Sequence, residues 1–181
     1  MMRKKWIVLI SIIILIILCF LYWPRRWDYI VIHHSAGNYG NIEHLQEIHN
    51  QRQSKEPINA IAYHYIIGNG NGMEDGKVDS DIRKKYNLWG VHVTSNNWIR
   101  NFRGLGICII GNLDKKEMTS KQYESLLLLT IKLMEEYNIE FENIGFHGKL
   151  QGESTNCPGK YFPYDKFSKD LKDKITVANK S

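Results

Sequence analysis

The sequence has no acidic residue in its first 26 positions and no net charge in the rest of the chain. Its 24 Lys and Arg residues exceed its 19 Asp and Glu residues by five. Five basic residues precede position 27, namely Arg3, Lys4, Lys5, Arg25 and Arg26. The pI near 9.0 therefore belongs to the N-terminal segment. Binding to nucleic acid through surface charge needs a basic footprint, so we expect no nucleic-acid partner.

Internal repeats, low-complexity tracts and long linkers are also absent from residue 27 onward. Hydrophobic residues make up 43% of the chain and charged residues 24%, which excludes global disorder. A domain of about 155 residues can bury a core without disulfides or metals to hold it. We therefore predict two parts: an N-terminal membrane anchor with basic flanks at residues 1–26, and one folded domain at residues 27–181.

The one long apolar run extends from Trp6 to Trp23 and holds eighteen residues without a charge. As a helix it would be about 27 Å long, close to the roughly 30 Å hydrocarbon core of a bilayer. A cleaved signal peptide is the alternative, but it has a shorter apolar region and a small-residue cleavage site. The following sequence CFLYWPRRW offers no such site. We expect residues 6–23 to form an uncleaved, single-pass transmembrane helix.

The charges on the two sides of this run predict its orientation. Three basic residues precede it and two follow it, so the positive-inside rule favours a cytoplasmic N-terminus. The domain would then lie on the outer, periplasmic or extracellular, side of the cytoplasmic membrane. Secretion after signal cleavage is the alternative.

Strand-like and helix-like segments alternate along the domain. Hydrophobic patterning predicts strands within residues 27–35, 60–68, 104–112 and 142–148. It predicts helices within residues 41–53, 123–138 and 164–175, the second preceded by the capping-box sequence Thr119-Ser120-Lys121-Gln122. This alternation implies an α/β domain in which helices cover a sheet.

Two polar side chains near the C-terminus have the spacing of a zinc half-site. Nine residues separate His147 from Cys157, which lies in the loop sequence STNCPG. A third ligand could come from His33 or His34 at the end of the first predicted strand, where alternation allows only one to face the site. Three protein ligands leave a tetrahedral zinc one open position, as in catalytic sites.

Other histidines and cysteines have simpler interpretations. Cys108 lies inside a predicted strand and is interpreted as a small buried hydrophobe. A disulfide between Cys108 and Cys157 stays open for a protein outside the cytoplasm. His44 and His49 lie on a polar helix and are expected to be solvated. Tyr63 and His64 are adjacent in a predicted strand and face opposite ways, so one of the two is expected to be a core residue.

Five motifs in order resemble one known family. IVIHHSA, AYHYIIGNGNGMEDG, WGVHV, GLGICIIGN and HGKLQGESTNCPGKYFP are similar to segments of the zinc-dependent N-acetylmuramoyl-L-alanine amidases of the type-2 class. That class shares its fold with peptidoglycan recognition proteins and phage lysozyme-amidases. The resemblance implies an α/β fold with a mixed central β-sheet flanked by helices, here preceded by the predicted transmembrane helix.

The resemblance also assigns site residues position by position. It implies Zn²⁺ as cofactor with ligands His33, His147 and Cys157. It implies catalytic roles for Tyr63 and Thr155, with Thr155 in the position that is Lys or Thr in relatives. His92 matches a pocket histidine implicated in substrate contact. Ala62 departs from the family pattern, since Gly is more usual before the tyrosine.

The activity implied by the resemblance is hydrolysis of the amide bond between the lactyl group of N-acetylmuramic acid and L-alanine in peptidoglycan. Two alternatives stay open. A sensor on the same fold would bind peptidoglycan without cleaving it, although non-catalytic relatives typically lose the cysteine ligand, which this chain retains. A zinc peptidase or amidase would cleave a different bond. The oligomeric state is not predicted.

Overall fold

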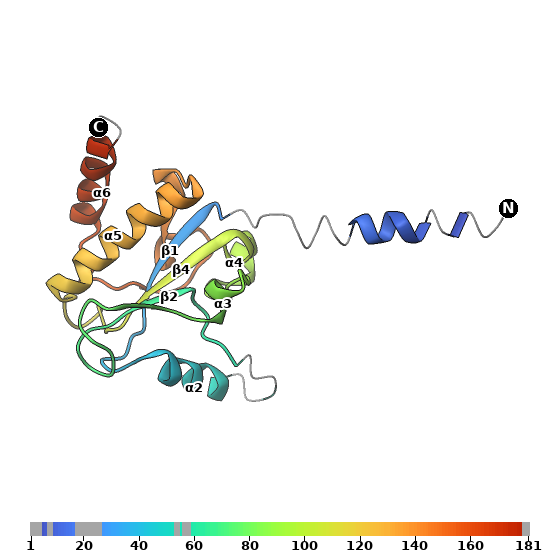
Figure 1. The fold of residues 1–181 in the computed structure, drawn as a ribbon. Helices are drawn as coiled ribbons and strands as arrows, with labels where there is room; N and C mark the ends of the chain where they lie inside the picture. Colours follow the sequence, from blue (N-terminus) through green and yellow to red (C-terminus); the bar gives the residue numbers. More distant parts are fainter. Residues whose placement is uncertain (1–4, 7–8, 17–26, 53–54, 56–58, 179–181) are drawn as a thin grey trace.

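The computed structural model describes residues 5–6, 9–16, 27–52, 55 and 59–178. The domain is built on a five-stranded mixed sheet with the strand order β3-β2-β4-β1-β5 (Figure 1). β1 (Tyr29–His34) is parallel to both of its neighbours, β4 (Gly104–Ile109) and β5 (Ile144–Phe146). β2 (Tyr65–Ile67) is parallel to β4, and β3 (Val78–Ser80) pairs with β2 in the antiparallel sense.

Helices cover both faces of the sheet, as the sequence predicts. α5 (Ser120–Tyr137) and α6 (Tyr164–Ala178) lie on one side, and α2 (Ile42–Arg52) lies on the other (Figure 1). Alternation along β1 and β4 divides the core accordingly. Ile32 and Ile107 pack in the cluster that contains α5 and α6 residues, whereas Cys108 packs in the cluster that contains Leu45 of α2.

The two central strands confirm the sequence prediction. Every residue of β4 is buried, and so are five of the six residues of β1. Such a strand has apolar neighbours on both faces, which is why its sequence is a nearly continuous apolar run. These two strands fix the position of the histidines that end β1.

The second strand is shorter than predicted. Residues 60–68 were expected to be extended throughout, but β2 contains only Tyr65–Ile67. The preceding backbone donates to side chains instead of to a sheet ladder. Asp81 Oδ2 accepts from the Ile61 N–H at 2.9 Å, and His49 Nδ1 accepts from the Ala62 N–H at 3.1 Å. Tyr63 therefore lies in an irregular segment just before the strand.

Short elements complete the fold. α3 (Ile82–Lys85) follows β3 and α4 (Trp98–Arg103) precedes β4, and 3₁₀ turns occupy Ser95–Asn97, Phe141–Asn143 and His147–Lys149. The sequence analysis predicted neither β3 nor these two helices. With three to six residues each, they are too short to show a periodic pattern.

α5 begins where the capping box predicts. The Thr119 hydroxyl accepts from the Gln122 N–H at 3.0 Å, and the Gln122 side chain accepts from the Thr119 N–H at 3.2 Å. This reciprocal pair satisfies two of the orphan N–H groups of the helix start.

The predicted transmembrane segment at residues 6–23 is only partly described. Residues 9–16 are helical, whereas residues 7–8 and 17–26 lie outside the described part of the chain. Among the residues that are described, no helix is both long and apolar enough to cross a membrane.

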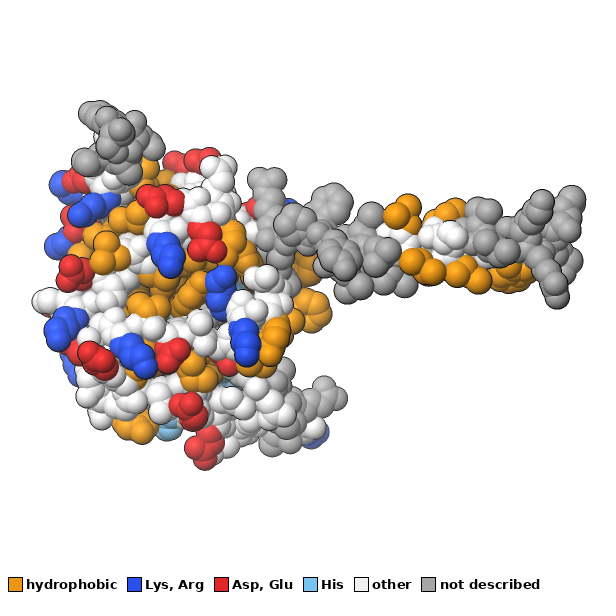
Figure 2. All heavy atoms as spheres, viewed as in Figure 1, with side chains coloured by type: hydrophobic (Ala, Val, Ile, Leu, Met, Phe, Trp, Pro, Cys, Tyr) orange, Lys and Arg blue, Asp and Glu red, His pale blue; other side chains and the backbone are white. Residues whose placement is uncertain are grey.

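Charges of both signs are mixed on the face that presents α5 and α6. Figure 2 shows Lys and Arg side chains interspersed there with Asp and Glu side chains. On α6 this mixing includes ion pairs at helical spacing, Lys166 with Asp170 and Lys169 with Asp173. Exposed pairs of this kind add little stability.

Candidate metal centre

The parallel sheet brings two histidines to the same edge. His33 lies near the C-terminal end of β1, and His147 follows directly after β5, the strand that pairs with β1. The carboxyl ends of parallel strands meet at one edge of a sheet, which is where ligands bind in α/β folds. The Nδ1 atoms of the two imidazoles are 3.2 Å apart.

The third side chain arrives on a loop that folds back onto His147. The Gly148 N–H donates to the Cys157 carbonyl at 2.5 Å. A Cβ atom at position 148 would lie 2.1 Å from the Thr155 carbonyl oxygen, so only glycine allows this approach. The loop thus places Cys157 Sγ 3.8 Å from His33 Nδ1.

These three donor atoms fit a zinc ion. All lie within 4.8 Å of one another. Zinc bonds of about 2.0–2.1 Å to nitrogen and 2.3 Å to sulfur place tetrahedral ligand atoms roughly 3.3–3.7 Å apart. The separations of 3.2 Å and 3.8 Å around His33 Nδ1 are close to these values. The set of two nitrogens and one sulfur is one that zinc prefers.

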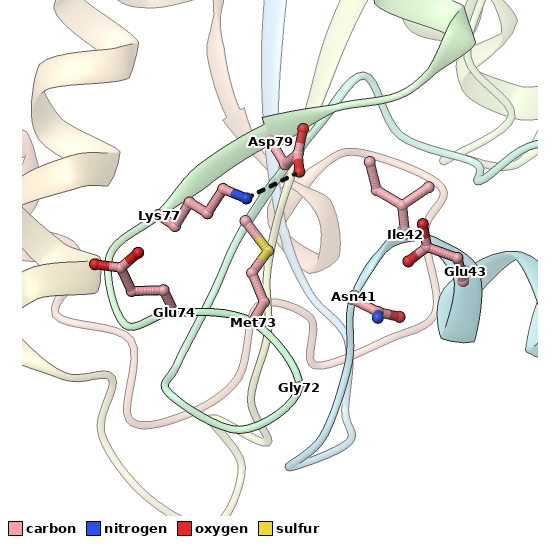
Figure 3. A pocket seen from close by; sticks show the side chains of 8 residues that line it. All are labelled: Asn41, Ile42, Glu43, Gly72, Met73, Glu74, Lys77 and Asp79. Carbon is pink, nitrogen blue, oxygen red and sulfur yellow. Dashed lines mark ion pairs between the residues drawn. The ribbon is translucent and has the colours of Figure 1, made fainter.

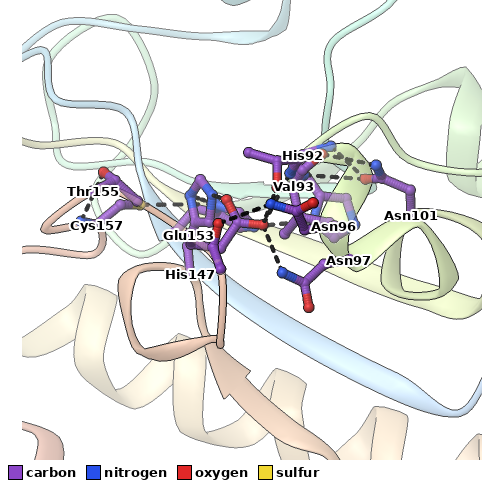
Figure 4. A network of polar contacts seen from close by, with 12 residues as sticks. His92, Val93, Asn96, Asn97, Asn101, His147, Glu153, Thr155 and Cys157 are labelled. Carbon is purple, nitrogen blue, oxygen red and sulfur yellow. Dashed lines mark hydrogen bonds and ion pairs between the residues drawn. The ribbon is translucent and has the colours of Figure 1, made fainter.

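Both imidazoles turn Nδ1 toward the cluster and Nε2 away from it. His147 Nε2 lies 3.0 Å from Glu153 Oε2 (Figure 4). His33 Nε2 lies 3.1 Å from His92 Nδ1. At His147 the Glu153 carboxylate is the acceptor, which keeps the ring proton at Nε2 and leaves the Nδ1 lone pair for a metal.

Burial keeps two of the ligand groups, the His33 imidazole and the Cys157 thiol, uncharged in the metal-free protein at neutral pH. It lowers the pKa of His33 well below its usual value, and the nearby His92 and His147 act in the same direction. Burial also raises the pKa of the Cys157 thiol to about 12, although the His34 N–H, which donates to Sγ at 3.3 Å, acts in the opposite direction. A protonated thiol is a poor nucleophile, so Cys157 is suited to metal ligation rather than to direct attack.

The two residues assigned to catalysis lie next to this cluster. The Tyr63 ring is 5.0 Å from the His33 ring between centroids. Burial raises the pKa of Tyr63 well above its usual value, and the nearby Cys108 thiol acts in the same direction. The Thr155 hydroxyl accepts from the Cys157 N–H at 3.2 Å and lies on an exposed loop. Both hydroxyls are therefore neutral groups that can donate a proton or a hydrogen bond.

His92 is inside the protein rather than on a pocket surface. Only 5% of its surface is exposed, and its backbone N–H donates to Asn101 Oδ1 at 2.8 Å. Its ring lies against Gly106 of β4, where an added Cβ would approach within 2.8 Å. Its Nδ1 atom contacts His33 Nε2 at 3.1 Å.

The remaining histidines have structural contacts. His34 faces away from the cluster and its Nδ1 accepts from the Leu113 N–H at 3.0 Å. His64 is fully buried and bonds to the backbone through both ring nitrogens, at Gly106 N and Leu88 O, so it is the core residue of the Tyr63–His64 pair. The prediction that His49 is solvated is wrong, because it is half-buried and caps the Ala62 N–H.

Cys108 and Cys157 are both free, so the disulfide that was left open does not form. Cys108 is fully buried in β4, as its apolar surroundings predict. Its burial raises the pKa of its thiol well above the usual value.

Glu153 is a site residue that the sequence pattern did not predict. Its carboxylate accepts from the Thr94 N–H and hydroxyl at 3.0 Å and 2.9 Å. It also accepts from Asn97 Nδ2 at 2.8 Å (Figure 4). Burial alone would raise the pKa of Glu153, but hydrogen bonds from Asn97, Thr94 and His147 outweigh it and lower the pKa. Only its position six residues after His147 hinted at a role.

A separate polar pocket of about 390 Å³ lies between the start of α2 and the β2–β3 turn (Figure 3). Lys77 and Asp79 form an ion pair on one wall, and Glu43 and Glu74 lie on others. None of its eight lining residues belongs to the histidine–cysteine cluster.

Comparison with known proteins identifies the family. The sequence profile of the family described as N-acetylmuramoyl-L-alanine amidase matches residues 23–160. Peptidoglycan-recognition protein SC2 of Drosophila melanogaster is 31% identical over 137 residues, which cover 73% of this chain and 68% of that protein.

Solved structures agree in fold. The N-acetylmuramoyl-L-alanine amidase LysC from Clostridium intestinale is 28% identical with a TM-score of 0.64, over 81% of this chain and 86% of that one. Drosophila peptidoglycan recognition protein SA is 23% identical with a TM-score of 0.58, over 78% of each chain, and shares the fold. The chain therefore belongs to the family of type-2 N-acetylmuramoyl-L-alanine amidases and peptidoglycan recognition proteins.

Proposed function

We propose that this protein is a zinc-dependent N-acetylmuramoyl-L-alanine amidase that cleaves the bond between the lactyl group of N-acetylmuramic acid and L-alanine in peptidoglycan. The observation that carries the proposal is the convergence of donor atoms from His33, His147 and Cys157 within 4.8 Å. Zinc would be held by these three side chains, with a fourth position open to a reactant.

The zinc ion, when bound, supplies a nucleophile at neutral pH, because it lowers the pKa of bound water from 15.7 to about 7. The protein's own residues hold and orient the reacting groups. His33 and His147 present Nδ1, while the Cys157 sulfur accepts a hydrogen bond from the His34 N–H.

Tyr63 and Thr155 are the proposed donors to the oxygen on which charge develops. Both are uncharged hydroxyl groups beside the cluster, and preorganised donors of this kind stabilise a developing oxyanion. For His92, burial and its contact with His33 favour orientation of that ligand over the substrate contact implied by the resemblance.

The second candidate function is a peptidoglycan sensor that does not cleave. This candidate stays open because similar proteins include ones named for peptidoglycan recognition rather than for amidase activity. The retained Cys157, whose Sγ lies 3.8 Å from His33 Nδ1, favours the enzyme, because both atoms can then ligate one zinc ion. A hydrolase with another bond preference is the third candidate, and only its products would differ.

The location of the protein is part of the same proposal. A domain at residues 27–181 acting on peptidoglycan would lie on the outer side of the cytoplasmic membrane, held by an anchor at residues 6–23. This part rests on the sequence pattern of the N-terminal segment and on the place of the substrate.

The test is digestion of purified peptidoglycan by the full 181-residue chain, followed by mass analysis of the products. Release of stem peptides that begin with L-alanine, leaving muramic acid free of peptide, is expected. His147→Ala should abolish release, whereas the matched control His44→Ala, on α2 and in contact with Tyr39, should retain it. Full activity of His147→Ala would contradict the proposal, and products cut at another bond would support the third candidate.

A further inference from the structure

Glu153 is a buried carboxylate for which the proposed mechanism has no use. It lies in the loop between His147 and Cys157, whose neighbouring residues are exposed, yet only 1% of its side chain is exposed. Burying a carboxylate is costly unless hydrogen bonds replace its water. The hydrogen-bond partners of the Glu153 carboxylate therefore indicate its role.

The two carboxylate oxygens have different partners. Oε1 accepts three hydrogen bonds, from the Thr94 N–H, the Thr94 hydroxyl and Asn97 Nδ2, at 2.8–3.0 Å. Oε2 faces His147 Nε2 at 3.0 Å (Figure 4). Three donors on one oxygen fix the plane of the carboxylate, so the other oxygen is a rigid acceptor aimed at the imidazole.

This arrangement determines how His147 is presented. An acceptor at Nε2 holds the ring proton there, and the lone pair of Nδ1 then points toward His33 Nδ1 at 3.2 Å. A ligating histidine that donates to a carboxylate binds metal more tightly because its tautomer and orientation are fixed. The equivalent partner of His33 is the uncharged ring of His92, so Glu153 supplies the only carboxylate contact described for these two histidines.

We propose that Glu153 is a positioning residue of the metal centre: its carboxylate holds His147 in the Nε2–H tautomer and in the orientation that ligates the metal. The proposal rests on the proposed zinc site. It assigns no contact between Glu153 and substrate. A purely structural role, tying the 94–97 segment to the 151–153 loop, is the competing explanation, because Asn97 also donates to the Gln151 carbonyl at 3.0 Å.

Glu153→Gln separates these explanations. A glutamine has the same shape and can still accept from Thr94 and Asn97 through its oxygen, but it then turns an amide N–H₂ toward His147 Nε2. Two donors would face each other, which favours the Nδ1–H tautomer that cannot ligate through Nδ1. We expect the full chain carrying this variant to bind Zn²⁺ about 10–100-fold more weakly in a chelator-competition titration.

Asn97→Ala is the matched comparison, because it removes the Asn97 contacts with Gln151 and with Glu153 Oε1 but leaves both Thr94 donors to Glu153 and the Glu153–His147 pair in place. We expect its Zn²⁺ affinity to stay within about threefold of the wild type. Equal losses of affinity in the two variants would overturn the proposal and favour the structural role. Unchanged affinity in Glu153→Gln would overturn it as well.

A measurement on the unmodified chain covers the case in which Glu153→Gln does not fold. Long-range ¹H–¹⁵N NMR of the metal-free protein should find His147 as the Nε2–H tautomer, and an Nδ1–H signal would overturn the proposal. Neither readout needs amidase activity. If the wild type binds Zn²⁺ but cleaves nothing, the proposed function fails. The assignment of Glu153 is still tested, because it depends only on the Zn²⁺ affinity of the variants and on the tautomer of His147.

Discussion

Tyr63 is a partly buried phenol beside the proposed ligand His33. Because burial raises its pKa, the hydroxyl keeps its proton at neutral pH and can donate to a developing oxyanion. We expect Tyr63→Phe to lower kcat by about 10²–10³, equivalent to about 2.7–4 kcal/mol, with Zn²⁺ content unchanged. Steady-state kinetics on a soluble muropeptide measures this.

Tyr65→Phe is the control for that change. Tyr65 is buried on β2 in the core cluster that contains α5 and α6, on the other side of the sheet from Tyr63 and Cys108. The kcat of Tyr65→Phe should equal that of the wild type within about twofold. Similar losses in both variants would indicate a packing effect instead of lost oxyanion stabilisation.

The buried histidines predict how stability responds to acid. Burial is the main cause that lowers the pKa of four of them: His33, His34, His49 and His92. In the unfolded chain they titrate near 6.5. Below that pH the unfolded state binds more protons than the folded state. The free energy of unfolding therefore decreases as the pH is lowered, by up to about 1.4 kcal/mol per pH unit for each histidine.

The metal-free protein in chelator should therefore lose thermal stability between pH 7 and pH 5, while stability from this source is fully present above pH 7. Calorimetry across this range measures the effect. A Tm that stays constant from pH 7.5 to pH 5 would show that these side chains are accessible to solvent in the folded state.

Individual site residues differed in how well the sequence predicted them. Strand alternation correctly separated His33 from His34, because a regular strand has a fixed period. Glu153 and His49 could not be predicted, since their partners lie on other segments and irregular backbone brings them together. Local sequence patterns do not encode such contacts.

At the scale of elements, α5 offers a direct comparison of two neighbouring leucines. Leu126 is fully buried against the sheet, whereas Leu128 is 55% exposed. We expect Leu126→Ala to lower the free energy of unfolding by about 2–5 kcal/mol through lost burial and a residual cavity. Leu128→Ala should change it by no more than about 0.5 kcal/mol. Urea unfolding of both variants measures the difference, and equal effects would contradict the described orientation of α5.

Elements whose periodic apolar pattern extends over six or more residues were predictable from the sequence, and shorter elements were not. β1, β4 and α5 carry apolar patterns of six or more residues that match their observed burial. β2 is truncated because Asp81 and His49 take the hydrogen bonds of the preceding backbone. These acceptors come from elsewhere in the chain, so the apolar run alone overestimates the length of the strand.

The whole molecule brings together residues that are more than 100 positions apart in sequence. The parallel pairing of β1 with β5 brings His33 next to His147, and the loop closed by Gly148 adds Cys157. Hydrophobic periodicity predicted the α/β class, and the spacing of His147 and Cys157 predicted a zinc half-site. The choice of His33 as third ligand came with the family resemblance, and strand pairing explains it physically.

Zinc dependence of amide cleavage is the most direct test of this function. Bound zinc should be quantified in the full chain, and release of stem peptides from peptidoglycan should be followed in the same sample with chelator, without it, and after zinc is restored. We predict one equivalent of zinc, loss of release with chelator, and recovery with zinc. Release that continues at full rate after zinc has been removed would contradict a metal centre formed by His33, His147 and Cys157.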